Sequence, residues 1–335
     1  MFVHKNVVRS LMRLEPNLLE IIPQQNTAIV DWSMGTTCNY SCSYCPTMLH
    51  DGAIAWPDEQ LWTTVLDTCD QHFDRPIQYV LSGGEPTVMP QFEKFITAIK
   101  NKRSGNLVSI ITNGSRTVNW WRKNKHLIDT VNMSVHIEQC DPNHILDVAL
   151  EYHNPGVNEL NVLIPIAPDT WDKSIAAAEL LASNANGYAV SLKRLRKNFG
   201  SESYEYSPEQ EYILQQYSLF NTYDESWVYP LPKPDRIAVN HTLVTTEGSV
   251  SLNANKLINE NNNVFTGMKC YIGIDKIFIN VWREITAGSW CPQGTHFNII
   301  GFLDRIDEIR WPTDPIVCEQ PRCMNATDMR TRKHR

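Results

Sequence analysis

The sequence has no apolar run that approaches the ~20 residues a helix needs to cross a bilayer. Its first residues also lack the charged and then apolar pattern of a secretory signal. Basic residues are not in excess, because 30 lysines and arginines stand against 37 aspartates and glutamates and give a net charge of −7. These absences argue against a membrane span, against secretion and against a broad nucleic-acid footprint. They predict a cytoplasmic protein.

What the chain does have is a core and many thiols. At 335 residues, of which 42% are hydrophobic, it suits one large domain or one domain with a small appendage. Nine cysteines without a secretion signal argue against a disulfide framework. They favour metal ligation in a reducing compartment.

Strand-like and helix-like segments alternate through the first two thirds of the chain. The expected strands are residues 27–32, 77–81, 107–111, 130–137, 159–166 and 188–192. The expected helices are residues 57–69, 90–100, 118–126, 142–152, 170–183 and a further one from residue 207. Six strand–helix units in a row imply an α/β fold with parallel strands and right-handed crossovers. The alternation alone permits either a barrel or a doubly wound sheet.

The pattern changes after a proline-rich bridge at residues 229–234. Short β-type runs follow at residues 242–246, 249–252 and 276–282. We therefore divide the chain into a lead-in (1–24, with a short helix at 7–14), a main domain (25–225), a small β-rich domain (235–325) and a basic, solvated tail (326–335).

Three cysteines, Cys38, Cys42 and Cys45, follow the first strand at a CxxxCxxC spacing. Three close thiolates can hold three irons of a cubane cluster. No fourth cysteine is near, which would leave one iron open, as catalytic zinc sites leave one position open. The alternatives are a zinc site that lacks a ligand and three unrelated free cysteines.

With the aromatic Tyr44 before its third cysteine, this motif resembles the signature of the radical S-adenosylmethionine (radical SAM) superfamily. The resemblance implies that SAM binds the open iron, that one electron cleaves it to a 5′-deoxyadenosyl radical, and that this radical abstracts hydrogen from a substrate. It also implies a partial (β/α)6 TIM-like barrel and an electron donor such as flavodoxin or ferredoxin.

The segment Ser82-Gly83-Gly84-Glu85 follows the second strand and resembles the GGE motif of that family. The two glycines let the backbone approach a ligand closely, and the resemblance implies that the turn and Glu85 hold the SAM amine. Taken alone, the same residues are a tight turn.

Polar residues at later strand ends are further candidates for binding SAM. They are Thr112, Asn113, Ser134, His136, Lys193, Arg194 and Arg196. The resemblance implies contacts to the ribose hydroxyls and the carboxylate, for which Ser134 and Arg194 are favoured. The alternative is that these residues cap strands or face solvent.

Cys140 follows the fourth strand, and in a barrel that end faces the active site. Its thiol could donate a hydrogen atom to a substrate radical, as cysteines do in some radical SAM epimerases, or it is a structural thiol. Glu138 and His136 could accept a proton at the same rim. Cys69, in the first helix, is expected to be a buried small hydrophobe.

Four late cysteines, Cys270, Cys291, Cys318 and Cys323, could hold a complete 4Fe–4S cluster or a structural zinc. The hairpin-like segment between the first two resembles the twitch domain, the shortened form of the SPASM domain. That resemblance implies one auxiliary cluster, which with four protein ligands would transfer electrons rather than bind substrate.

The sequence thus predicts a radical SAM enzyme of oxidoreductase or isomerase type, with SAM, a 4Fe–4S cluster and a second auxiliary cluster. Its substrate is expected to be a small polar molecule such as a sugar, amino acid or nucleotide, which is oxidised, rearranged or epimerised. The alternative is a maturase that oxidises, cross-links or epimerises a peptide or protein. Nucleic-acid base modification and a non-catalytic metal-binding protein come after these.

Overall fold

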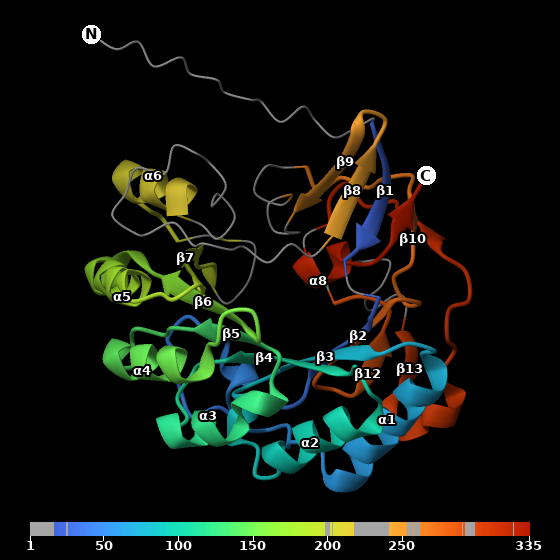
Figure 1. Cartoon of the computed structure of the whole chain (residues 1–335), viewed down its shortest axis with the longest axis horizontal. Helices are drawn as coiled ribbons and strands as arrows, with labels where there is room; N and C mark the ends of the chain where they lie inside the picture. The colour runs from blue at the N-terminus through green and yellow to red at the C-terminus, as the bar shows by residue number, and fades with distance from the viewer. Residues whose placement is uncertain are drawn as a thin grey trace.

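The computed structural model shown in Figure 1 describes residues 17–24, 26–197, 202, 204–217, 241–252, 257, 262–289, 291, 299–323 and 325–335. The helix expected at residues 7–14 and the proline-rich bridge at residues 229–234 lie outside the described residues. Within the described part of the chain, no helix is long and apolar enough to cross a membrane.

Six parallel strands form the centre of the larger sheet. They are β2 (Ala28–Ser33), β3 (Ile77–Ser82), β4 (Leu107–Thr112), β5 (Thr130–Ser134), β6 (Glu159–Ile166) and β7 (Ala189–Arg194), and they lie side by side in this order. The helices between and after them are α1 (Glu59–His72), α2 (Phe92–Lys102), α3 (Val118–Asn124), α4 (Pro142–Tyr152), α5 (Trp171–Ser183) and α6 (Pro208–Tyr217). Short 3-10 turns occur at Thr47–Leu49, Pro86–Val88, Lys125–Leu127, Pro168–Thr170 and Leu303–Glu308.

The predicted α/β class is confirmed. In Figure 1, helices α1 to α5 form an outer arc with the strands on its inner side. A consecutive strand order with helices outside is what a partial barrel requires, whereas a doubly wound sheet reverses its order and carries helices on both faces.

Local signals set the ends of these elements. The Asp58 carboxylate accepts a hydrogen bond from the Leu61 N–H at 2.8 Å and caps α1. Strand β5 ends at Ser134, three residues earlier than expected, because the backbone turns at His136, whose carbonyl accepts from the Cys140 N–H at 3.0 Å. The strand predicted to reach Ile137 is therefore shorter, and His136 lies in the turn that follows it.

Aromatic side chains fill the space between sheet and helices. Trp32 is 2% exposed and meets Phe95 edge to face, with 5.7 Å between ring centroids. Trp121 is fully buried, and Cys69 is buried in α1. The tryptophans are packing residues here, and Cys69 is the buried small hydrophobe that the sequence predicted.

The hairpin expected in the small C-terminal domain forms, but it joins the larger sheet. Strand β11 (Lys276–Ile279) pairs in parallel with β2, and β12 (Glu284–Thr286) and β13 (Ile299–Phe302) continue antiparallel beyond it. The sheet therefore has nine strands. Ile277 and Ile279 are fully buried, so this hairpin covers what would otherwise be the open edge at β2.

A second sheet brings both ends of the described chain together. Its order is β14 (Ile316–Val317), β10 (Lys269–Cys270), β15 (Lys333–His334), β1 (Leu18–Pro23), β8 (His241–Thr245) and β9 (Gly248–Leu252). The short helix α8 (Ala326–Met329) precedes β15.

Two expectations are corrected by this sheet. The lead-in contains strand β1, whose Leu18 and Ile21 are buried. The basic tail is solvated only in part, because β15 pairs with both β1 and β10 and Lys333 is 1% exposed, while Arg332 and Arg335 are exposed. The pairing of β15 and the carbonyl acceptors around Lys333 offset the free-energy cost of burying its charge.

Candidate functional site

The three cysteines of the CxxxCxxC motif line one cavity of about 460 Å³. They lie on the segment between β2 and α1, which we call the cysteine loop (residues 34–56). The Cys45 N–H donates to the Cys42 carbonyl at 3.0 Å and closes the turn between them. Burial raises the pKa of the Cys42 thiol to about 12 and that of Cys45 to about 11. A metal centre bound here would have to displace these protons.

The Gly83-Gly84 turn packs directly against the cysteine loop. The Gly84 N–H donates to the Gly35 carbonyl at 2.8 Å, and the Glu85 N–H donates to the Thr37 carbonyl at 2.9 Å. A Cβ on Gly84 would lie 2.0 Å from the Thr37 oxygen, closer than any real contact. The glycines therefore permit a close approach to the chain's own backbone, next to Cys38, as well as to any ligand in the cavity.

Glu85 is a buried anchor between strand ends. It is 1% exposed. Its Oε1 accepts from the Thr87 N–H and hydroxyl and from the Thr112 hydroxyl, at 3.1, 2.6 and 2.7 Å. Among the described residues, only the Asn113 N–H donates to its Oε2, at 2.6 Å, so this oxygen keeps capacity for one more donor. Burial raises the pKa of this carboxyl, and the four hydrogen bonds oppose that shift.

Asn113 links the end of β4 to the cysteine loop. Its side-chain amide donates to Asn39 at 2.9 Å, and Asn39 in turn donates to the Ser115 hydroxyl at 2.9 Å. Thr112 and Asn113 both line the cavity. Asn113 thus also holds the loop that carries Cys38 and Cys42, whereas Thr112 donates to Glu85.

His136 and Tyr44 form a pair on the wall that continues from β5. The Tyr44 hydroxyl lies 2.6 Å from His136 Nδ1, and the rings stack at 5.9 Å. Burial, with a contribution from Lys193, lowers the pKa of His136 to about 4. A neutral imidazole therefore holds Tyr44 at neutral pH. Ser134 lines the same cavity.

Three predicted site residues do not belong to the cavity lining that the described residues form: Ser82, Glu138 and Cys140. Glu138 instead accepts from the Ser43 N–H at 2.7 Å and from its hydroxyl at 2.6 Å. It positions the cysteine loop. Cys140 is half-buried against the hydrophobic core, and burial raises the pKa of its thiol to about 11. This placement favours the structural role for Cys140 over hydrogen donation.

Three cations line the cavity after β7. Arg194, which the sequence favoured for the SAM carboxylate, donates from both terminal nitrogens to Glu211 of α6 and lies over the Tyr206 ring. Lys193 is accessible to water in the cavity and makes no hydrogen bond or ion pair with the described part of the chain. Surrounding protein lowers its pKa. Lys193 is thus the better-placed cation for an anionic ligand group.

Some lining residues were missed by the sequence reasoning: Tyr40, Leu49, His50, Ile111, Pro165 and Leu195. Two of them carried a usable signal. Tyr40 lies inside the CxxxCxxC motif, and Pro165 lies near the end of a predicted strand. Leu49 and His50 reach the cavity through the 3-10 turn after Cys45, which no pattern predicted.

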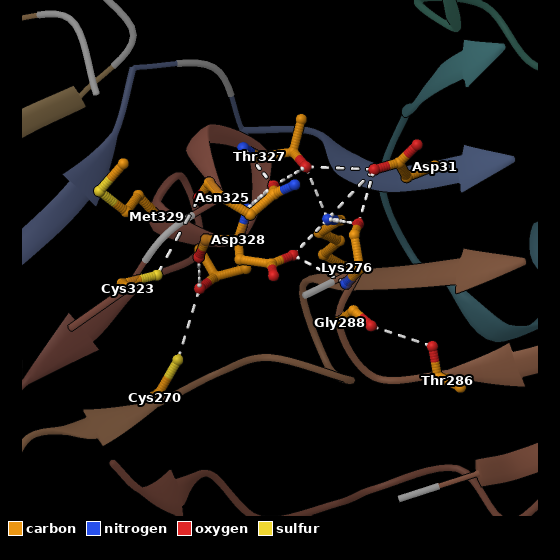
Figure 2. A network of polar contacts seen from close by, with 12 residues as sticks. Asp31, Cys270, Lys276, Thr286, Gly288, Cys323, Asn325, Thr327, Asp328 and Met329 are labelled. Atoms are coloured by element: carbon orange, nitrogen blue, oxygen red, sulfur yellow. Dashed lines mark hydrogen bonds and ion pairs between the residues drawn. The ribbon is translucent and has the colours of Figure 1, made fainter. Parts of the chain in front are cut away.

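The four late cysteines come together around the second sheet, and no disulfide joins any of them. Cys270 lies in β10 beside β14, and β14 leads directly into Cys318, whose N–H donates to the Met268 carbonyl at 2.8 Å. The thiols of Cys270 and Cys291 lie close enough to Cys323 to help burial raise its pKa to about 12. Figure 2 shows Cys270 and Cys323 on one side of α8.

A buried ion network separates these cysteines from the main sheet (Figure 2). The Lys276 ammonium, fully buried, lies between Asp328 of α8 and Asp31 of β2, and it is 3.3 Å from the latter. It also donates to the Thr327 hydroxyl at 2.7 Å, and Thr327 donates to Asp31 at 3.1 Å. This network ties the second sheet to the strand that precedes the cysteine loop.

Residues 32–186 match the family model described as the radical SAM superfamily. Among solved structures, hexahistidine-tagged anSMEcpe with bound AdoMet is 13% identical over 84% of this chain and 80% of that chain, with a TM-score of 0.52. BtrN in complex with AdoMet and 2-DOIA is 13% identical over 86% of this chain and 84% of that chain, with a TM-score of 0.40. Streptococcus suis SuiB is 12% identical over 86% and 66%, with a TM-score of 0.49. No curated protein sequence matches the chain.

Residues 32–186, slightly less than half of the chain, therefore match the radical SAM superfamily, as the cysteine motif predicted. This family uses SAM and a 4Fe–4S cluster. The likeness to anSMEcpe is a likeness of fold. The twitch assignment of residues 235–325 stays a prediction.

The residues that line the cavity fit a 4Fe–4S cluster and SAM. Three free thiols line a cavity that also holds the Gly83-Gly84 turn and one spare acceptor on Glu85. No group of three His, Cys, Asp or Glu side chains among the described residues is arranged to hold a single metal ion. A cluster makes a different demand, because each thiolate binds its own iron.

Proposed function

We propose that this chain is an enzyme that cleaves SAM reductively at the Cys38, Cys42 and Cys45 site and abstracts hydrogen from a small polar substrate. The observation that carries the proposal is the shared cavity, which brings the three thiols, the Gly83-Gly84 turn and the strand-end residues to one place. When bound there, a 4Fe–4S cluster and SAM supply the electron transfer that forms the 5′-deoxyadenosyl radical.

The chain's own residues have separate tasks in this proposal. Glu85 offers Oε2 to the SAM ammonium while its other contacts hold the strand ends. Lys193, which has no ion pair among the described residues, offers its cation to a carboxylate. Tyr44, Glu138 and Asn113 keep the cysteine loop in place through His136, Ser43 and Asn39.

A small substrate is favoured over a peptide by the size of the cavity. About 460 Å³ lies towards the lower end of the ~300 to 1,000 Å³ found for ligand pockets, and SAM must share that space. We further propose that the C-terminal cysteines hold a second 4Fe–4S cluster, which would accept the electron released when the substrate radical left by hydrogen abstraction is oxidised to the product.

The test of SAM cleavage is formation of 5′-deoxyadenosine. Anaerobically reconstituted protein, reduced with dithionite and given SAM, should form it at a rate that liquid chromatography with mass spectrometry can follow. The matched control is Cys38→Ala/Cys42→Ala/Cys45→Ala, which should lose all cleavage and about half of the iron, since three of seven proposed ligands are gone. Full iron loading without 5′-deoxyadenosine in the wild-type protein would contradict the proposal.

The substrate class is tested by deuterium transfer. Small-molecule and peptide fractions from cells grown in heavy water are offered separately to the reduced enzyme with unlabelled SAM. Deuterium should enter 5′-deoxyadenosine from the small-molecule fraction, because the abstracted atom comes from the substrate. Transfer from the peptide fraction alone would establish the maturase alternative.

A further inference from the structure

Lys333, in the last described strand, is a buried cation that contacts no carboxylate within the part of the chain that the structure describes. Its side chain is 1% exposed. Its ammonium donates to the carbonyls of Asp328, Met329 and Thr331 at 3.0, 3.2 and 3.2 Å. It also donates to the Thr331 hydroxyl at 3.0 Å and lies 5.2 Å from the centre of the Phe265 ring.

These contacts suit a charged side chain at Lys333. Every polar partner that the structure describes for it is an acceptor, and an ammonium offers three N–H donors. Three carbonyl dipoles and an aromatic face stabilise a cation at this point without neutralising it. The net positive charge therefore remains in the protein interior, where it acts on whatever lies nearby.

The groups that lie nearby are the late cysteines. The Thr331 hydroxyl that accepts from Lys333 is also 3.5 Å from the Cys270 thiol, so a single hydroxyl separates the two side chains. Phe265, on the other side of the ammonium, belongs to the turn whose backbone binds Cys318: the Gly267 N–H donates to the Cys318 carbonyl at 2.7 Å.

Another buried cation in the region has a different role. Lys276 lies between Asp31 and Asp328, so two carboxylates contact its charge. Among the described residues, Lys333 contacts neutral acceptors only. If the side chain at position 333 only filled space, an apolar residue would do so at a lower desolvation cost.

We propose that Lys333 is a positioning charge for the C-terminal cysteine centre, which it makes easier to reduce. This inference rests on the proposed second cluster. A one-electron reduction adds one negative charge to the thiolate-bound centre, with the electron taken from the external reductant. A fixed ammonium one hydroxyl away stabilises that extra charge more than it stabilises the oxidised state.

The experiment isolates the C-terminal centre in the full-length chain. Cys38→Ala/Cys42→Ala/Cys45→Ala removes the first site, and the remaining cluster is titrated with dithionite while electron paramagnetic resonance follows its reduced form. Adding Lys333→Met should lower the reduced-to-oxidised ratio at a fixed potential about tenfold, or about 59 mV for a one-electron couple. Lys333→Arg keeps the charge and should stay close to the parent.

Two controls separate charge from structure. Lys94→Met removes an equal charge from an exposed, distant helix and should leave the potential unchanged. If Lys333→Met does not fold, Lys333→Gln, whose amide can still donate to the same carbonyls, takes its place and should show the same shift.

The outcomes distinguish the two proposals. Equal potentials in the parent and the neutral variants, with the cluster present, would overturn the role of Lys333 and leave the second cluster standing. A triple-alanine protein that binds no iron–sulfur cluster at all would overturn both.

Discussion

The two cysteine centres of this chain are built in opposite ways. The first takes three thiols from eight consecutive residues, and they line a cavity of about 460 Å³. The second takes four thiols from segments between residues 270 and 323, and Cys270 and Cys318 are buried under paired strands and the end of the chain. One centre is open on a ligand cavity, and the other is enclosed by protein.

That difference separates the two tasks that the proposal assigns. An open centre with three protein ligands can bind and transform a molecule, as catalytic metal sites do. An enclosed centre with four ligands exchanges electrons, and its surroundings set its potential. The buried contact of Lys276 with Asp31 and Asp328 joins the two regions, because Asp31 lies on the strand before the cysteine loop.

The first and largest expected effect comes from removing the Lys276 ion pairs that join the two regions. Lys276→Met leaves Asp31 and Asp328 buried without their cation, which should lower the free energy of unfolding by about 3 to 5 kcal/mol. Urea denaturation of the cluster-free protein measures it. Lys94→Met, whose partner Glu59 is exposed, should cost less than about 1 kcal/mol. Equal losses in the two variants would mean that the regions are held together by other contacts.

The second effect falls on the open centre alone. In Gly84→Ala, the new Cβ meets the Thr37 carbonyl and displaces the backbone next to Cys38. The rate of 5′-deoxyadenosine formation should fall about 100-fold or more, because misplacement by about 1 Å costs that much at a reaction centre. Iron at the C-terminal centre should remain.

Gly156→Ala is the matched control for this change. Gly156 has a positive φ of +81°, which Gly84 does not have, and no atom lies within 4 Å of a Cβ built there. The variant carries backbone strain without the clash, so cleavage should be retained. A Gly84→Ala protein with normal cleavage would show that the cysteine loop adapts to the lost contact.

The contrast between the two regions also explains what the sequence could and could not predict. The first site depends on near neighbours: CxxxCxxC, the glycine turn and the strand ends each follow a strand directly, and topology brings successive strand ends together. Thr112, Asn113, Ser134 and His136 line the cavity for that reason.

The second region depends on distant pairings that no local pattern encodes. Strand β15 has two residues, and it exists because β1 and β10 offer their edges to it. A basic hexapeptide at a chain end reads as solvated, and nothing local shows that Lys333 meets three carbonyls of the preceding turn. Likewise, no sequence pattern shows that Glu211 lies opposite Arg194 and forms an ion pair with it. Without that ion pair in view, the sequence favours Arg194 for binding a ligand.

The third effect compares one histidine from each region. Burial lowers the pKa of both His136 and His241 from 6.5 to about 4. The unfolded chain therefore binds more protons between these values, so each histidine costs stability as the pH falls through that window. Between pH 7 and 5, the loss should be about 1 to 2 kcal/mol for each. His136→Gln and His241→Gln should each reduce this loss of stability in the cluster-free protein. Thermal unfolding at pH 7 and at pH 5 measures the loss. An unchanged pH dependence in either variant would mean that the histidine is protonated in the folded state.

The smallest effect on SAM cleavage is expected from the enclosed centre. Cys291→Ser/Cys323→Ser removes two of its four thiols, so the iron content should fall by about half. Cleavage of SAM should stay within about threefold of the parent, because the open centre keeps its ligands and its cavity.

Cys140→Ala is the control, since its thiol belongs to neither centre, and it should change neither iron content nor SAM cleavage. Serine variants that lose all cleavage while remaining folded would mean that electrons reach the open centre through the enclosed one. Variants that unfold would instead assign the late cysteines to a structural metal.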